Sequence, residues 1–228
     1  MYCYSFKKFA GHDRVFKAPF SVGKAGDLLA TEGDFLLNLG EGISFPELIH
    51  HQYPPTSASV IYPAFFDQHF LSFLHRMVYE RYTSYKSVIK YFVSSEIPEM
   101  LAREQRAKPP KKIQISSLGE YRFETTGQYL LIFPDNRTRY NLLSPELLED
   151  KSVINLVSSD TQNRKNIHRR EAKQGKSGIV VATHSEVFQP FSNLKKILIF
   201  DPHKWYYNNQ QDPRYHLPTV AKKMGEIY

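Results

Sequence analysis

One acidic residue stands where a short apolar strand is expected to end. The run KILIF at 196–200 is followed by Asp201, and Pro202 and His203 come next. A carboxylate at the end of a buried strand can hold Mg²⁺ beside a phosphate, and a neighbouring glutamate can activate water for hydrolysis. Proline has no ionisable group and cannot do so. We therefore interpret Asp201 as a capping or surface carboxylate, and we assign no catalytic residue.

Nucleotide hydrolysis also requires a loop that holds the phosphates. Such a loop is rich in glycine, and its backbone N–H groups bind phosphate oxygens while a lysine and a hydroxyl residue serve phosphate and Mg²⁺. The Gly-Lys pair in SVGKAG at 21–26 lacks the required spacing and the following Ser or Thr. The histidines His50, His51, His69 and His75 do not have the spacing of a metal site. We expect no metal and no bound cofactor.

A loop with aromatic, basic and amide side chains follows Asp201. It reads KWYYNNQQDPRYH at 204–216. Aromatic rings can stack on nucleic-acid bases, each worth ~1–3 kcal/mol, while cations meet phosphates and amides bond to backbone or base edges. The residues suited to these contacts are Lys204, Trp205, Tyr206, Tyr207, Gln210, Gln211, Arg214 and Tyr215. The alternative is that the rings only cover the end of a sheet.

A second basic segment is RKNIHRREAKQGK at 164–176. On a helix, four of its cations would lie near one face, namely Lys165, Arg169, Lys173 and Lys176. Such a face suits a track of phosphates, and we add Lys165, Arg169 and Lys173 to the predicted DNA-binding residues. A solvated helix face is the alternative.

Short apolar runs predict the sheet that positions these residues. They are KIQIS at 112–116, YLLIF at 129–133, VINLV at 153–157, GIVVA at 178–182 and KILIF at 196–200. Continuous rather than alternating apolar runs indicate strands buried on both faces of a mainly parallel sheet. The segment before GIVVA is compatible with a helix that stops at Gly175. We predict an α/β fold with flanking helices and with binding groups at the carboxyl ends of the strands.

The N-terminal half is organised differently. Residues 1–60 predict short strands and turns, because glycines and prolines interrupt brief apolar runs. Apolar residues at three- and four-residue intervals predict core-facing helices at 64–82 and 84–93. A double proline at 109–110 within a basic stretch indicates a boundary near 103–111. We predict an N-terminal region at 1–105, small and mixed or helical, and a second domain at 106–228.

The whole chain is basic and carries one cysteine. Its 228 residues have a net charge of +7, which favours a polyanionic partner such as nucleic acid. The single cysteine, Cys3, excludes an internal disulfide and fits a reducing compartment. We find no secretory signal and no apolar run of the ~18 residues that a membrane helix needs. These features predict a cytoplasmic protein without a membrane partner.

Three segments of the C-terminal half carry a further pattern. They are GQYLLIFPD at 127–135, GKSGIVVATHSEVFQPFSNLKKILIFD at 175–201 and QQDPRYHLPTVA at 210–221. In order and spacing they resemble the first motor lobe of the primosomal protein N′ (PriA) family, superfamily 2 DNA helicases of replication restart. The second segment resembles the strand, the GTRS-type motif and the Walker B strand of the family. The third resembles the loop that follows.

The resemblance implies a RecA-like fold and a loop at 204–216 that contacts single-stranded DNA. It makes Asp201 a degenerate Walker B residue, with Pro202 in place of the family's glutamate. It implies single-stranded or forked DNA and replication-restart proteins as partners. The family uses ATP and magnesium, which a chain without the phosphate loop does not support.

Three functions remain open at this point. The first is a DNA-binding, catalytically inactive PriA-like protein of replication restart or repair. The second is one part of an ATP-dependent DNA helicase that another chain completes. The third is a structural or protein-interaction remnant of a split or truncated helicase. The sequence does not separate the first from the third.

Overall fold

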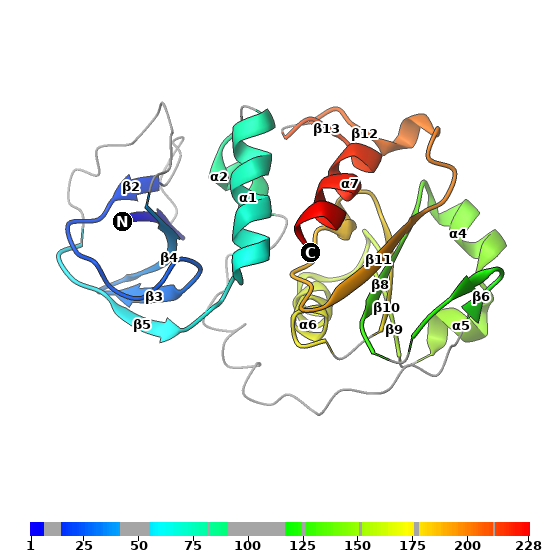
Figure 1. Cartoon of the computed structure of the whole chain (residues 1–228), viewed down its shortest axis with the longest axis horizontal. Helices are drawn as coiled ribbons and strands as arrows, with labels where there is room; N and C mark the ends of the chain where they lie inside the picture. The colour runs from blue at the N-terminus through cyan, green and yellow to red at the C-terminus, as the bar shows by residue number, and fades with distance from the viewer. Residues whose placement is uncertain are drawn as a thin grey trace. The chain divides into compact units, whose positions relative to one another are not determined.

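The computed structural model describes residues 1–6, 15–41, 55–81, 83–90, 117–124, 126–150, 152–175, 178–211 and 213–228. The chain divides into two compact units, Met1–Lys90 and Tyr91–Tyr228 (Figure 1). Each unit has a main sheet of its own. The predicted boundary near 103–111 and the predicted strand at 112–116 lie outside the described residues.

The first unit contains a five-stranded antiparallel sheet. Its strands are β1 (Tyr2–Ser5), β2 (Val15–Lys17), β3 (Leu28–Thr31), β4 (Asp34–Gly40) and β5 (Ser59–Tyr62), in the order β2-β1-β4-β3-β5. Cys3 packs with Phe16, Leu29 and Leu36 in an apolar cluster. Burial raises the pKa of the Cys3 thiol to about 12, so this cysteine stays protonated and is not a nucleophile.

Two helices complete the first unit, α1 (Gln68–Arg81) and α2 (Tyr85–Ile89). The aromatic and aliphatic stripe that predicted the first helix is buried, namely Phe66, Phe70, Phe73, Leu74, Met77 and Val78. The side chain of His75 on α1 lies 2.6 Å from the hydroxyl of Tyr85 on α2. Burial lowers the pKa of His75, so this histidine serves as a neutral hydrogen-bonding group between the helices.

A tight turn at Gly26 is hydrogen-bonded both to the antiparallel sheet and to the residues that precede α1. Gly26 has a φ of 93°, its N–H donates to Asn38 O at 2.7 Å, and its carbonyl accepts from Phe66 N at 2.9 Å. The carboxylate of Asp27 accepts from Ala64 N at 2.7 Å. A Cβ atom at position 26 would lie 2.0 Å from Phe66 O, so glycine is required here for space as well as for conformation.

The second unit is built on a four-stranded parallel sheet. Its strands are β8 (Gln128–Phe133), β9 (Val153–Asn155), β10 (Ile179–Thr183) and β11 (Leu194–Ile199), in the order β11-β8-β10-β9 (Figure 1). Four of the five predicted apolar runs form these strands. The predicted α/β class with a parallel sheet is therefore confirmed, beside the antiparallel sheet of the first unit.

Shorter elements surround the parallel sheet. The helices are α4 (Asn136–Leu142), α5 (Pro145–Glu149), α6 (Gln162–Lys173) and α7 (Leu217–Ile227), with 3₁₀ turns η1 (His184–Val187) and η2 (Trp205–Tyr207). Two small hairpins pair β6 (Ser117–Leu118) with β7 (Tyr121–Arg122) and β12 (Asn208–Asn209) with β13 (Tyr215–His216). Gly175, with φ 63°, follows the end of α6 as predicted. No described helix has both the length and the apolar character to cross a membrane.

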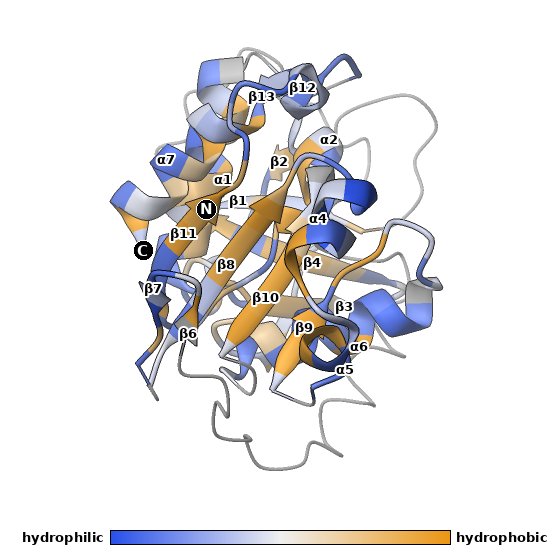
Figure 2. Ribbon diagram, turned by 90° about the vertical axis from the view of Figure 1, so that its right-hand side faces the viewer, coloured by the Kyte–Doolittle hydropathy of each residue, from blue (hydrophilic) through white to orange (hydrophobic). Residues whose placement is uncertain are grey.

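Both faces of the parallel sheet are covered, which explains the continuous apolar runs. On one face Leu131, Phe133 and Val181 belong to an apolar cluster. Residues of α5 and of the β6-β7 hairpin pack against this cluster. On the other face the alternate residues Leu130 and Ile132 are fully buried. Figure 2 shows apolar colour over β8 and β10 and mostly polar colour over α4 and α6.

The side chain of Gln128 fixes the amino-terminal end of the sheet. Its amide nitrogen donates to Ala172 O on α6 at 2.7 Å. Its oxygen accepts from the backbone N–H groups of Ser192 and Asn193, just before β11, at 2.9 and 3.0 Å. One buried amide thus joins the start of β8, the last turn of α6 and the start of β11.

The Gly26 turn gives a stability prediction. Gly33→Ala should cost about 1–2 kcal/mol of unfolding free energy, because Gly33 also has a positive φ but an added Cβ would meet no neighbour within 4 Å. Gly26→Ala should cost roughly 2 kcal/mol more, because Phe66 O must move. Urea denaturation followed by circular dichroism measures the difference. The fluorescence transition of Trp205, in the second unit, should not move, and equal costs for the two variants would contradict the proposed overlap.

Candidate nucleic-acid interface

The candidate site lies at the carboxyl edge of the parallel sheet, after β8 and β11. Asp135 follows β8 and Asp201 follows β11. In parallel α/β sheets, this edge is where ligand-binding groups collect. Asp201 is exposed and has a left-handed φ of 48°, and its carbonyl accepts from Lys204 N at 3.0 Å. This turn directs the chain away from the strand and into η2.

Tyr207 anchors the loop to the sheet. Its side chain is fully buried, and its hydroxyl lies 2.6 Å from Phe200 O and 3.2 Å from Ile132 O. Burial, with the negative charges of Asp201 and Asp135, raises the pKa of this phenol well above its usual value, so the hydroxyl stays a neutral donor. The sequence predicted a ring face free to stack on a base. The structure corrects that prediction, because the ring is enclosed.

The two residues before Tyr207 are exposed and form a ring pair. Trp205 is 67% exposed and Tyr206 is 38% exposed. Their ring centroids lie 4.2 Å apart with an angle of 36° between the planes. An exposed aromatic surface of this kind can accept a nucleic-acid base.

Charges of both signs flank the ring pair. Lys204 is exposed and directly precedes Trp205. The carboxylate of Asp135 caps α4 by accepting from Thr138 N at 2.7 Å. This hydrogen bond lowers the pKa of Asp135, and the positive charge of Lys204 lowers it further. Sequence reasoning missed Asp135, although it follows the apolar run GQYLLIF after one proline, much as Asp201 follows KILIF.

The β12-β13 hairpin holds the rest of the loop. Asn208 pairs with His216 and Asn209 with Tyr215, and the Asn209 amide donates to Pro213 O at 2.9 Å. Tyr215 is buried, with its ring edge-on to Phe188 at 5.2 Å, so its predicted stacking role is also corrected. The predicted residues that the hairpin leaves exposed are Gln210, Gln211 and Arg214.

Helix α6 directs its predicted cations toward the protein. The Lys165 amino group lies 2.9 Å from the Glu186 carboxylate and donates to Ser158 O at 3.0 Å. Arg169 is only 8% exposed, and burial lowers the pKa of its guanidinium to about 10 while Glu186 opposes the shift. The Lys173 amino nitrogen is buried as well. The predicted phosphate track on this face thus falls on cations that are paired or largely buried and stays a prediction, and Lys176 lies outside the described residues.

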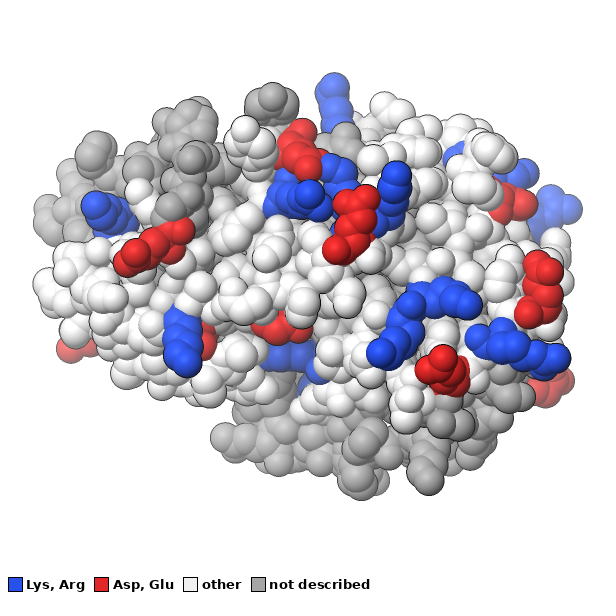
Figure 3. Space-filling view, in the orientation of Figure 1, with Lys and Arg blue, Asp and Glu red and all other residues white. Residues whose placement is uncertain are grey.

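Charges of both signs are mixed on one face of the molecule (Figure 3). On the face that Figure 3 presents, Lys and Arg side chains stand among Asp and Glu side chains rather than in one basic field. Within the described part of the chain, no group of three His, Cys, Asp or Glu side chains is arranged to hold a metal ion. The sheet edge presents exposed rings, amides and a few cations.

Comparison with known proteins adds one relationship. A stretch of 60 residues is 40% identical to the replication restart protein PriA of Bacillus subtilis (strain 168). The stretch makes up 26% of this chain and 7% of that protein. No family model matches the chain. Over about a quarter of its length, the chain is similar to PriA.

The Tyr207 anchor can be tested by removing one oxygen atom. Tyr207→Phe should lower the unfolding free energy of the second unit by about 1–2 kcal/mol, because the buried Phe200 and Ile132 carbonyls lose the hydroxyl. Tyr206→Phe removes the same atom from an exposed ring and should change stability by less than about 0.5 kcal/mol. Urea denaturation followed by Trp205 fluorescence measures both. Equal losses would show that the buried hydroxyl is not the anchor.

Proposed function

We propose that the chain is a PriA-like DNA-binding protein that acts in replication restart or repair and does not hydrolyse ATP. The observation that carries the proposal is the exposed Trp205–Tyr206 ring pair, held at the sheet edge by Tyr207. The similarity to the replication restart protein PriA supports the process. The preferred ligand is single-stranded or forked DNA, because stacking needs bases that are not already paired.

The proposed contact surface is smaller than the set predicted from sequence. Lys204, Trp205, Tyr206, Gln210, Gln211 and Arg214 are exposed and form it. Tyr207 and Tyr215 act as its support. Each stacked base contributes ~1–3 kcal/mol, and Lys204 and Arg214 add a salt-dependent contribution by displacing counterions from phosphates.

The second unit is proposed to be a degenerate RecA-like lobe. Four parallel strands with helices on both faces support this, as does the position of Asp201 after β11, where a Walker B aspartate would stand. Pro202 stands where a glutamate would activate water. In the family, a phosphate loop and a helix precede the strand that β8 resembles. Here residues 117–122, just before β8, form the β6-β7 hairpin instead.

The prediction that the chain does not hydrolyse ATP can be tested by measuring phosphate release. The purified chain should release no phosphate from ATP above a mock purification, with or without forked DNA, because water activation and phosphate binding both lack their residues. Asp201→Ala should leave this background unchanged. DNA-stimulated release that Asp201→Ala abolishes would favour the alternative of a helicase part completed by another chain.

Trp205 gives a direct test of binding, because it is the single tryptophan. Oligothymidine should quench its fluorescence, and Trp205→Ala should weaken the binding of labelled oligothymidine by ~1–3 kcal/mol in an anisotropy titration. Tyr79→Ala is the matched control, since Tyr79 is 69% exposed but lies in the first unit. Unchanged emission at low salt, or a Trp205→Ala variant that binds like the parent, would favour the structural or protein-interaction remnant.

The salt dependence separates phosphate contacts from structural cations. Arg214→Ala should reduce the slope of log affinity against log salt by about 1, because one phosphate contact is lost. Lys165→Ala should leave the slope unchanged, since Lys165 is already paired with Glu186. If the two variants change the slope equally, α6 contacts DNA after all.

A further inference from the structure

Helix α4 presents a stripe of amide, basic and aromatic side chains. Asn136, Arg137, Tyr140 and Asn141 are exposed. Positions three and four apart lie on the same side of a helix, so these four residues share one face. The sequence of α4, NRTRYNL, contains no acidic residue. This face therefore combines the same kinds of side chain as the exposed part of the 204–216 loop, namely a ring, amides and a cation.

A buried cation supports the ring of Tyr140. The Arg139 guanidinium lies 4.7 Å from the centroid of this ring, at the distance of a cation–π contact. Arg139 itself is fully buried, and its Nη1 donates to Asn155 Oδ1 at 2.9 Å and to Leu156 O at 3.2 Å, where β9 ends. Tyr140 is nevertheless 57% exposed. A side chain fixed to the sheet thus holds this ring in place at the surface.

Helix α4 and η2 lie at the same edge of the parallel sheet. α4 follows β8 and η2 follows β11, which are adjacent strands (Figure 1). The positive charge of Lys204, the N-cap of η2, acts on the carboxylate of Asp135, the N-cap of α4. The exposed large apolar and aromatic side chains in the described part of the second unit are Tyr140, Leu142, Trp205 and Tyr206. They all belong to these two elements.

We infer that the exposed face of α4 is a second contact for single-stranded DNA, in which Tyr140 stacks on a base and Arg137 meets a phosphate. This contact depends on the DNA binding proposed above and continues it from η2 to α4. A helix rises about 1.5 Å per residue, so Tyr140 lies roughly 6 Å along α4 from its first residue. A strand bound at the Trp205–Tyr206 pair must therefore continue past the start of α4 to reach it. Only a longer strand should use both sets of rings.

Oligothymidine of two lengths tests this contact. The probes are labelled strands of about 4 and about 16 nucleotides, the range that OB-fold sites cover, titrated with the full chain and followed by anisotropy. Tyr140→Ala should weaken binding of the long strand about tenfold, because one stacked base is lost, and should leave the short strand within about twofold of the parent. Tyr140→Phe keeps the ring and should bind both strands like the parent. Trp205→Ala should weaken both about tenfold.

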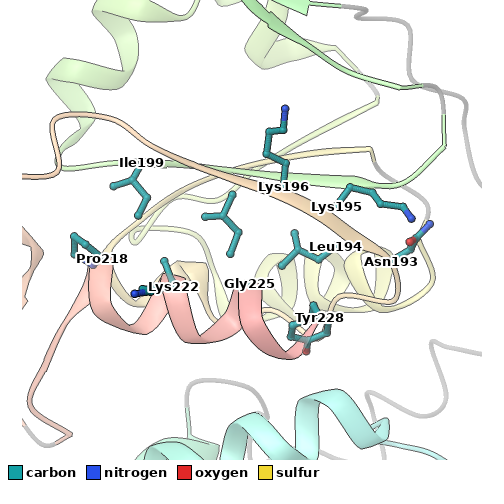
Figure 4. A pocket seen from close by; sticks show the side chains of 11 residues that line it. Asn193, Leu194, Lys195, Lys196, Ile199, Pro218, Lys222, Gly225 and Tyr228 are labelled. Atoms are coloured by element: carbon teal, nitrogen blue, oxygen red, sulfur yellow. The ribbon is translucent and has the colours of Figure 1, made fainter.

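Three further variants separate the stripe from the rest of the surface. Leu142→Ala changes a residue that is 52% exposed on the same helix but lies outside the stripe, and it should bind both strands like the parent. Arg137→Ala should reduce the slope of log affinity against log salt by roughly 0.7–1 for the long strand. Lys222→Ala should leave this slope unchanged. Lys222 is exposed beside a pocket between β11 and α7, and no residue that lines this pocket belongs to α4 or to the 204–216 loop (Figure 4).

The outcomes distinguish this contact from DNA binding as such. If Tyr140→Ala binds both strands like the parent while Trp205→Ala weakens them, α4 is not a contact and the proposed function stands. An equal effect of Tyr140→Ala and Leu142→Ala would also overturn the inference, because the stripe would then have no special part. Unchanged binding of the short strand shows that a variant is folded. If the parent chain binds neither strand, the proposed function and the α4 contact both fail.

Discussion

The hydroxyl of Tyr207 is the contact on which the candidate surface depends. It donates hydrogen bonds to carbonyl groups at the ends of β11 and β8, so one side chain fixes the loop to two adjacent strands. η2 is a single 3₁₀ turn, in which successive side chains point about 120° apart. With Tyr207 directed inward, Trp205 and Tyr206 must point outward. The exposed ring pair is thus a geometric consequence of the buried phenol.

Positive charge has two different uses in the second unit. On α6, Lys165 forms an ion pair with Glu186, and the negative charge of Glu186 also favours the charged form of the buried Arg169. Around the ring pair and beside β11, lysines and Arg214 remain exposed. In this unit, cations thus serve both the internal packing and the exposed surface.

The parallel sheet could be predicted from sequence because its central strands are buried on both faces and therefore read as unbroken apolar runs. The direction of individual side chains could not. In WYY at 205–207, three aromatic residues are consecutive, and their order does not show which ring is buried. Tyr207 turns inward because its hydroxyl donates to carbonyls at the ends of β8 and β11. Arg169 lies on a helix face that looked solvent-facing by charge alone. Its charge partner, Glu186, is distant in sequence and belongs to another element.

Two side chains close the β8–β11 pair at its opposite ends, the amide of Gln128 at the start and the phenol of Tyr207 at the finish. Side-chain clamps at both ends prevent the strands from sliding past one another. The loop that Tyr207 holds is therefore ordered before any ligand arrives. The binding proposed for this surface would then lose little conformational entropy, which matters most for a small surface of two rings and two cations.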